Sequence, residues 1–113
     1  MTFFIILNKK SLMGSSKTVQ YSAKEKTFAR TAKAMGHPAR IVIVQFLAAY
    51  GLGTNKHFME ITKLCDATIC QHLKELEHAG IITELYIKNK HYYRLCTKAE
   101  ESVKELQLVF SQS

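Results

Sequence analysis

The most reactive side chains of this 113-residue chain gather in one short stretch. Cys65, Cys70 and His72 lie within it, and His57 comes shortly before. Thiols and imidazoles are ligands that Zn²⁺ prefers, so a metal or redox site is the first chemistry to consider. Cys65 and Cys70 are five positions apart and would not share a helix face, and no feature beside them predicts a lowered thiol pKa. We therefore expect no metal and no cofactor, and we expect Cys65 to be a small buried residue.

Covalent catalysis is the second chemistry to consider. Cys70 and His72 are two positions apart and point in different directions, and no carboxylate is placed to orient the imidazole. The five glycines are scattered, so no phosphate-binding loop is present. We expect that the chain is not an enzyme.

The segment TICQHLKELEHAGII, residues 68–82, suggests nucleic-acid recognition instead. Thr68 and Gln71 lie at the beginning of a predicted helix, whereas Glu75 and Glu77 lie in its second half. Gln is a good bidentate partner for adenine, Thr can contact a thymine methyl, and the positive end of a helix favours phosphate. We interpret the first turns as a base-reading surface; a merely solvated face is the alternative.

Two segments rich in Ile, Thr and Tyr, residues 81–86 and 91–96, predict a hairpin joined at residues 87–90. Asn89 tolerates the left-handed conformation that such a turn needs. The residues that could reach DNA backbone or minor groove are Lys88, Asn89, Lys90 and Arg94. An ordinary charged turn is the alternative.

The net charge of +7 is unevenly distributed. Residues 1–40 hold eight cations and one acid, whereas residues 41–113 hold eight of each. We expect residues 1–20 to form a flexible basic arm and residues 21–113 to form the folded domain. Such an arm suits a polyanion, or serves as a solubilising tail.

The N-terminal apolar run is too short to form a membrane-spanning helix. Phe3–Leu7 falls far below the about 20 residues that a spanning helix needs, so we expect no membrane association. Translation could begin at Met1 or at Met13. Three cysteines without a CxxC pair indicate a reduced, cytoplasmic chain.

Capping motifs predict where the helices begin. Ser22 and Glu25 form a capping box that opens a helix over residues 22–35. Pro38 suits the first position of a helix over residues 38–50, which is apolar on nearly every side and should form the centre of the fold.

A short helix over residues 55–64 should precede the segment discussed above. Asp66 is a candidate N-cap for the next helix and Gly80 a candidate terminator. The residues at helical spacing that should face the core are Ile69, Leu73 and Leu76.

A second capping box, Thr97 with Glu100, opens the last helix. The order helix, helix, short helix, helix, hairpin, helix predicts a mostly α fold with a small β-hairpin. A tight helix pair followed by a two-stranded ribbon is the winged helix-turn-helix arrangement.

Three segments resemble the ArsR-type bacterial transcriptional repressors. KAMGHPARIVIVQFLA (33–48) resembles their LGHPxRxxIL segment, TICQHLKELEHAGII (68–82) their TVSQHLKxLxxAGLV recognition helix, and KNKHYYRL (88–95) their GRxxYYxL wing, with Asn89 in place of the glycine. The resemblance spans about residues 22–110.

The resemblance implies a homodimeric repressor that binds double-stranded DNA at a palindromic operator. The residues that match DNA contacts are Thr68, Gln71, His72, Lys74, Lys88, Asn89, Lys90, Arg94 and Arg40. His72 lies at the border of the core, and Arg40 matches an arginine near the DNA backbone or paired within the protein. The residues that match the dimer interface, on the first and last helices, are Phe28, Ala32, Met35, Val103, Leu106 and Phe110.

The metal signatures of these repressors are missing. Only Cys65 stands near the position of their CxC pair, and residues 97–113 contain no Asp or His. We therefore expect no small-molecule ligand. Two alternatives are a winged-helix module for protein–protein contact and a thiol- or metal-responsive repressor that uses Cys65 and Cys70.

Overall fold

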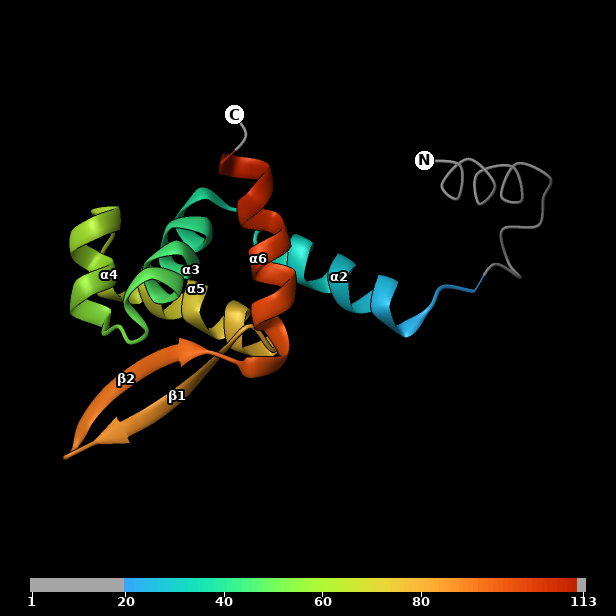
Figure 1. The fold of residues 1–113 in the computed structure, drawn as a ribbon. Helices are drawn as coiled ribbons and strands as arrows, with labels where there is room; N and C mark the ends of the chain where they lie inside the picture. Colours follow the sequence, from blue (N-terminus) through green and yellow to red (C-terminus); the bar gives the residue numbers. More distant parts are fainter. Residues whose placement is uncertain (1–19, 112–113) are drawn as a thin grey trace.

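The computed structural model of the chain describes the backbone of residues 20–111 and the side chains of residues 20–108. The expectations for residues 1–19 and for Phe110 lie outside this part. Figure 1 shows a helical domain with one hairpin. Its elements are α2 (Ala23–Ala34), α3 (Pro38–Tyr50), α4 (Asn55–Thr62), α5 (Asp66–His78), β1 (Ile82–Ile87), β2 (Lys90–Leu95) and α6 (Thr97–Ser111). The predicted order of elements and the winged helix-turn-helix fold are confirmed.

Local hydrogen bonds explain where the first helices begin. The Glu25 amide donates to Ser22 Oγ at 3.1 Å, and the Ser22 amide donates to Glu25 Oε1 at 2.9 Å. This is the predicted capping box. Pro38 begins α3 as expected, and His37 caps it by accepting from the Ala39 amide through Nδ1 at 3.1 Å.

The predicted N-cap of α5 is wrong by one residue. Cys65 occupies the cap position with extended backbone, and Asp66 is the first helical residue. The Asp66 carboxylate instead accepts a hydrogen bond from Asn55 Nδ2 at 3.0 Å. Asp66 still adds a favourable negative charge to the first turn. At the other end, Gly80 follows the helix with φ of 76°, as predicted.

The core lies between α3, α5 and the base of the hairpin. Its fully buried apolar side chains are Ile43, Val44, Leu47, Phe58, Ile69, Leu73, Leu76, Ile81 and Val103. The predicted inward stripe of α5 is confirmed. The α3 helix is less enclosed than expected, since Val42 and Tyr50 on its outer side are exposed.

The hairpin has a two-residue turn at Lys88 and Asn89, with φ of 48° and 67°. Positive φ at both central residues matches the strand twist, and Asn tolerates it well. The strands pair antiparallel from Ile82↔Leu95 to Ile87↔Lys90, and each lies one residue nearer the turn than predicted.

Gly53 anchors the hairpin to the helical body. Its amide and carbonyl exchange hydrogen bonds with Tyr93 at 3.0 and 2.8 Å. A Cβ atom on Gly53 would lie 2.7 Å from the ring of Phe58, so only glycine fits this approach.

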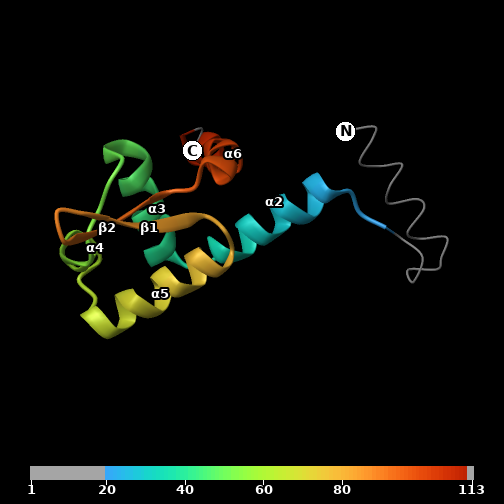
Figure 2. The same ribbon diagram turned by 90° about the horizontal axis from the view of Figure 1, so that it is seen from below.

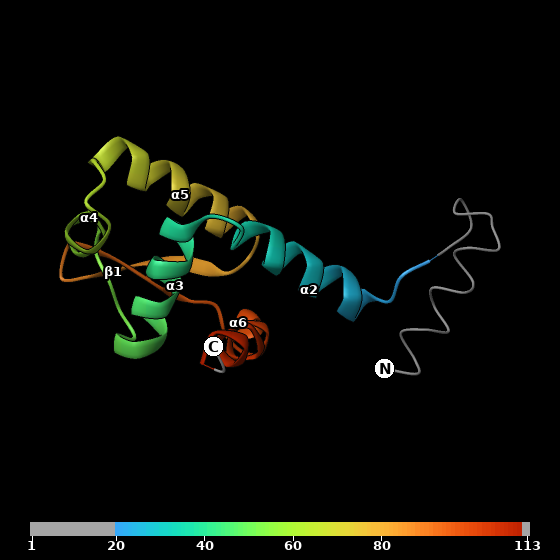
Figure 3. The same ribbon diagram turned by 90° about the horizontal axis from the view of Figure 1, so that it is seen from above.

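Figures 2 and 3 show α5 and α6 on opposite sides of the domain with α3 between them, while α2 projects away from the body. Within the described residues, no helix is long and apolar enough to cross a membrane.

Candidate nucleic-acid interface

The outer face of α5 is a polar stripe. Because Ile69, Leu73 and Leu76 are buried, the residues on the opposite side of the helix point to solvent. Gln71 and Lys74 are exposed there, as the DNA-contact interpretation requires. The other exposed members of this stripe are Ala67 and His78. Sequence reasoning missed these two, although the spacing 67, 71, 74, 78 is itself helical.

Thr68 lies at the edge of this stripe and is half-buried. Its hydroxyl is 3.3 Å from Cys65 Sγ. This hydrogen bond, followed by the Thr68 backbone amide, lowers the pKa of the Cys65 thiol. Two expectations are therefore corrected, since Cys65 is exposed rather than buried and does have an environment that favours its thiolate.

The other cysteines have different surroundings. Cys70 is half-buried and accepts from Asn55 Nδ2 at 3.4 Å, away from the Cys65–Thr68 pair. Burial raises the pKa of Cys96. Within residues 20–111, no three His, Cys, Asp or Glu side chains are grouped so that they could hold a metal ion.

His72 and Arg40 depart from the predicted DNA-contact set. The His72 side chain is only 7 % exposed, because it points back between α5 and α3. Arg40 Nε donates to His72 Nδ1 at 3.1 Å, so Arg40 is paired within the protein. Arg40 was expected either near the DNA backbone or paired within the protein, and the structure shows the internal pairing. A buried imidazole does not present its ring to a base edge, so we leave His72 out of the interface.

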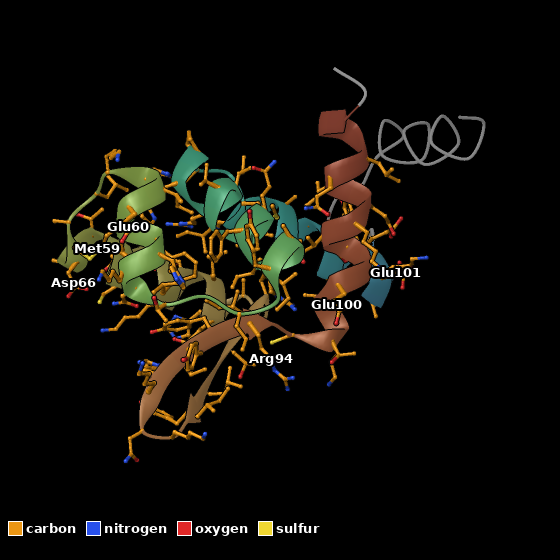
Figure 4. The ribbon with its side chains drawn as sticks, turned by 60° about the vertical axis from the view of Figure 1, so that its left-hand side comes forward. Met59, Glu60, Asp66, Arg94, Glu100 and Glu101 are labelled. Atoms are coloured by element: carbon orange, nitrogen blue, oxygen red, sulfur yellow. The ribbon has the colours of Figure 1, made fainter. Side chains whose placement is uncertain are left out.

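The hairpin separates its cations into two groups. Lys88, Asn89 and Lys90 are exposed at the tip. Arg94 is also exposed but pairs with Thr83, one position from the base of the hairpin. Figure 4 shows Arg94 close to the beginning of α6, well away from Asp66 at the beginning of α5. Arg94 therefore does not belong to the tip.

One face of the hairpin carries a cluster that the sequence did not reveal. The rings of Tyr86 and His91 stack at 4.7 Å, and His91 Nε2 lies 2.6 Å from Glu84 Oε1. This contact is an ion pair only when the imidazole carries a proton. Burial, and then the Glu84 carboxylate, raise the pKa of Glu77 on α5. The cluster joins the second half of α5 to the hairpin.

The predicted dimer residues also divide into two groups. Met35 and Val103 are 6 % and 1 % exposed within one protomer, so they belong to its core. This corrects the expectation that they face a partner. Phe28, Ala32 and Leu106 are half-buried, and Leu108 on α6 is exposed.

An open groove of about 920 Å³ lies between α2 and α6. Phe28 and Ala29 line it from α2, and Lys98, Ser102 and Glu105 line it from α6. Such a combination of apolar and charged side chains is common in protein interfaces.

Several solved structures of similar fold are transcriptional regulators or repressors by name. HlyU from Vibrio cholerae N16961 is 17 % identical with a TM-score of 0.69, covering 80 % of this chain and 99 % of its own. The transcriptional repressor PagR of Bacillus anthracis is 26 % identical with a TM-score of 0.63, covering 74 % and 95 %. Mb0332 from Mycobacterium bovis, a homodimeric winged helix-turn-helix DNA-binding domain described as a possible ArsR-family regulator, is 21 % identical with a TM-score of 0.66, covering 84 % and 91 %.

These likenesses establish the winged helix-turn-helix fold for this chain. No protein-family model matches it, and no characterised protein matches it significantly by sequence.

Proposed function

We propose that this chain is a sequence-specific DNA-binding transcriptional regulator of the ArsR type, and a repressor that binds a palindromic operator as a homodimer. The observation that carries the proposal is the exposed Gln71–Lys74 stripe on α5 together with the cationic hairpin tip. In a winged helix-turn-helix, these are the elements that meet the major groove and the neighbouring backbone.

The residues take different roles in this proposal. Gln71 reads a base edge, and Thr68 contacts a base or phosphate from the edge of the stripe. Lys74 and the tip residues Lys88 and Lys90 bind phosphates, and Asn89 adds an amide donor. Arg94, at the base of the hairpin, is limited to a peripheral phosphate contact.

The homodimer forms through α2 and α6 in this proposal. Phe28, Ala32 and Leu106 remain partly exposed in one protomer, and the groove beside Phe28 is open. A C2 pairing would cover both apolar faces with one contact, which is the commonest solution for a soluble oligomer. A regulator of this kind would work in the bacterial cytoplasm, where the DNA is.

A protein-interaction module is the second candidate, and one observation favours it. Tyr86 and Ile87 near the hairpin tip are 69 % and 40 % exposed. Exposed apolar residues on the wing are expected when a winged helix binds protein. The polar α5 stripe favours DNA, so we keep DNA as the primary partner.

Selection of bound duplexes from a random pool at fixed salt tests the function. We expect one enriched site with two-fold symmetry. Enrichment of an asymmetric site would contradict the palindrome, and no enrichment above a random duplex would favour the second candidate.

Sedimentation equilibrium tests the dimer separately. We expect twice the protomer mass of 12.9 kDa at micromolar concentration. Phe28→Asp should shift the mass towards the monomer, because the carboxylate would be desolvated in the interface. A wild-type monomer under these conditions would contradict the dimer.

A further inference from the structure

The Arg40 side chain joins three helices at one point. Its Nε donates to His72 Nδ1 on α5 at 3.1 Å, and its Nη1 donates to the Ala34 carbonyl at the end of α2 at 3.3 Å. Arg40 itself lies in the first turn of α3. The guanidinium therefore connects α5, which carries the polar stripe, to the helix that we assign to the dimer interface.

The bond to His72 exists only for one protonation state. Nδ1 can accept from Arg40 only while it carries no proton, because a protonated imidazole is a donor at both nitrogens. A protonated His72 would also place a second cation against the guanidinium. The hydrogen bond therefore forms when His72 is neutral, whereas a protonated His72 loses the acceptor and is repelled by Arg40.

The surroundings of His72 favour the neutral form. Burial, then His37, then Arg40 lower the pKa of His72. The His37 ring lies 4.4 Å from the His72 ring. In the described part of the chain, His37 and Arg40 are the charged or titratable groups that shift His72, and no carboxylate offsets them.

His72 also lies where a small movement affects recognition. It directly follows Gln71 and precedes Lys74 by two positions, but it points to the opposite side of α5. Loss of its contact would allow α5 to turn or shift relative to α3. Base contacts depend on the position of such side chains to a fraction of an ångström, whereas phosphate contacts by long lysines tolerate more.

We propose that Arg40 and His72 form a positioning pair that holds α5 against the ends of α2 and α3 while His72 is neutral, and that acid releases it and weakens specific DNA binding. This inference rests on the proposed DNA-binding function. His72 acts through Gln71 and Lys74 rather than by touching DNA.

The test uses the full chain and the duplex selected at pH 7.5. Affinities of wild type and His72→Gln are measured from pH 7.5 to 5.5, for this duplex and for a random one. Gln keeps an acceptor for Arg40 and does not titrate, so the variant should bind normally at pH 7.5. Over this range wild type should lose at least about threefold affinity relative to His72→Gln, on the selected duplex only.

His57→Gln is the matched control, because His57 is exposed on α4, outside the polar stripe, and Gln can keep its cap on the Thr54 amide. It should follow the wild-type pH profile. Identical profiles for wild type and His72→Gln would overturn the proposal, as would equal losses on the random duplex, since those would indicate general charge effects.

A measurement without DNA separates this inference from the proposed function. The ¹⁵N chemical shifts of the His72 ring in the wild-type protein should show an unprotonated Nδ1 at pH 7.5, and the Arg40 Nε–H signal should change as the ring is protonated. A protonated Nδ1 at pH 7.5 would overturn the pair even if DNA binding is intact. A failure to select any duplex would contradict the proposed function. The ¹⁵N shifts of His72 and the Arg40 Nε–H signal would then still decide whether the Arg40–His72 pair exists.

Discussion

The α5 helix and the hairpin both belong to the candidate DNA interface, but they are held in different ways. Three inward side chains of α5 have at most 1 % exposure, and a fourth, His72, is bonded to Arg40. The hairpin is anchored at its base through Tyr93 and Gly53, while its tip residues are exposed. A firmly positioned helix suits base reading, and a lightly supported tip suits electrostatic contact with phosphate.

The largest expected effect concerns the core side of α5. Leu73→Ala should lower the free energy of unfolding by about 2–5 kcal/mol, because it leaves a cavity under the helix. Leu85→Ala on β1 is the matched control, since Leu85 is only half-buried. Urea unfolding followed by circular dichroism measures both. Equal losses would show that the hairpin is packed as tightly as α5.

The anchor of the hairpin should be the next most sensitive point. Gly53→Ala places a methyl group 2.7 Å from the Phe58 ring, so Phe58 or the bridge to Tyr93 must shift. We expect a loss of about 1–3 kcal/mol in unfolding free energy. Gly36→Ala is the comparison outside this anchor: a Cβ there would lie 3.1 Å from the Lys33 carbonyl oxygen, which requires a smaller shift, so we expect a smaller loss of unfolding free energy. An unfolding free energy of Gly53→Ala equal to that of wild type would mean that the hairpin is not held by this contact.

Binding measurements should separate the two regions by role. Gln71→Ala should weaken binding to the selected duplex by about 1–3 kcal/mol and leave random duplex nearly unaffected. Lys90→Ala should weaken both duplexes similarly and reduce the salt slope by about 0.9 per subunit. Fluorescence anisotropy at several salt concentrations gives both quantities. The division of roles fails if the two variants lose affinity in the same pattern.

The smallest expected effect is on the pH dependence of stability, which should have opposite signs for Glu77 and His72 on the two sides of α5. The pKa of Glu77 is raised in the folded state, so its contribution to stability is present below its usual pKa and is lost as pH rises through the raised value. The pKa of His72 is lowered, so its contribution is present above about 6.5 and is lost as pH falls.

The wild-type protein should lose unfolding free energy between about pH 4 and pH 6, and Glu77→Gln should abolish that loss. The wild-type protein should also lose unfolding free energy between pH 7.5 and 5.5, and His72→Gln should abolish that second loss. Thermal unfolding in matched buffers measures both trends. Parallel trends in the two variants would contradict the assigned environments.

Local patterns were sufficient for the elements themselves. The capping box at Ser22, the Pro38 start, the inward stripe of α5 and the left-handed turn at Asn89 all depend on residues within a few positions of each other. Hydrogen bonds and periodicity over such short distances are encoded directly in neighbouring residues, and the exposed position of Gln71 followed from the same periodicity.

The choice of partners required the tertiary structure. Asp66 is held by Asn55, eleven positions away, and Cys65 stands at the N-cap position. His72 turns inward because Arg40, thirty-two positions away, meets it there. Met35 and Val103 look like interface residues on their own helices, but the protomer buries them. By itself the sequence determined the helices, the hairpin and their polar faces; only the tertiary structure decided which polar or apolar side chains are used internally, because that depends on contacts between residues far apart in the chain.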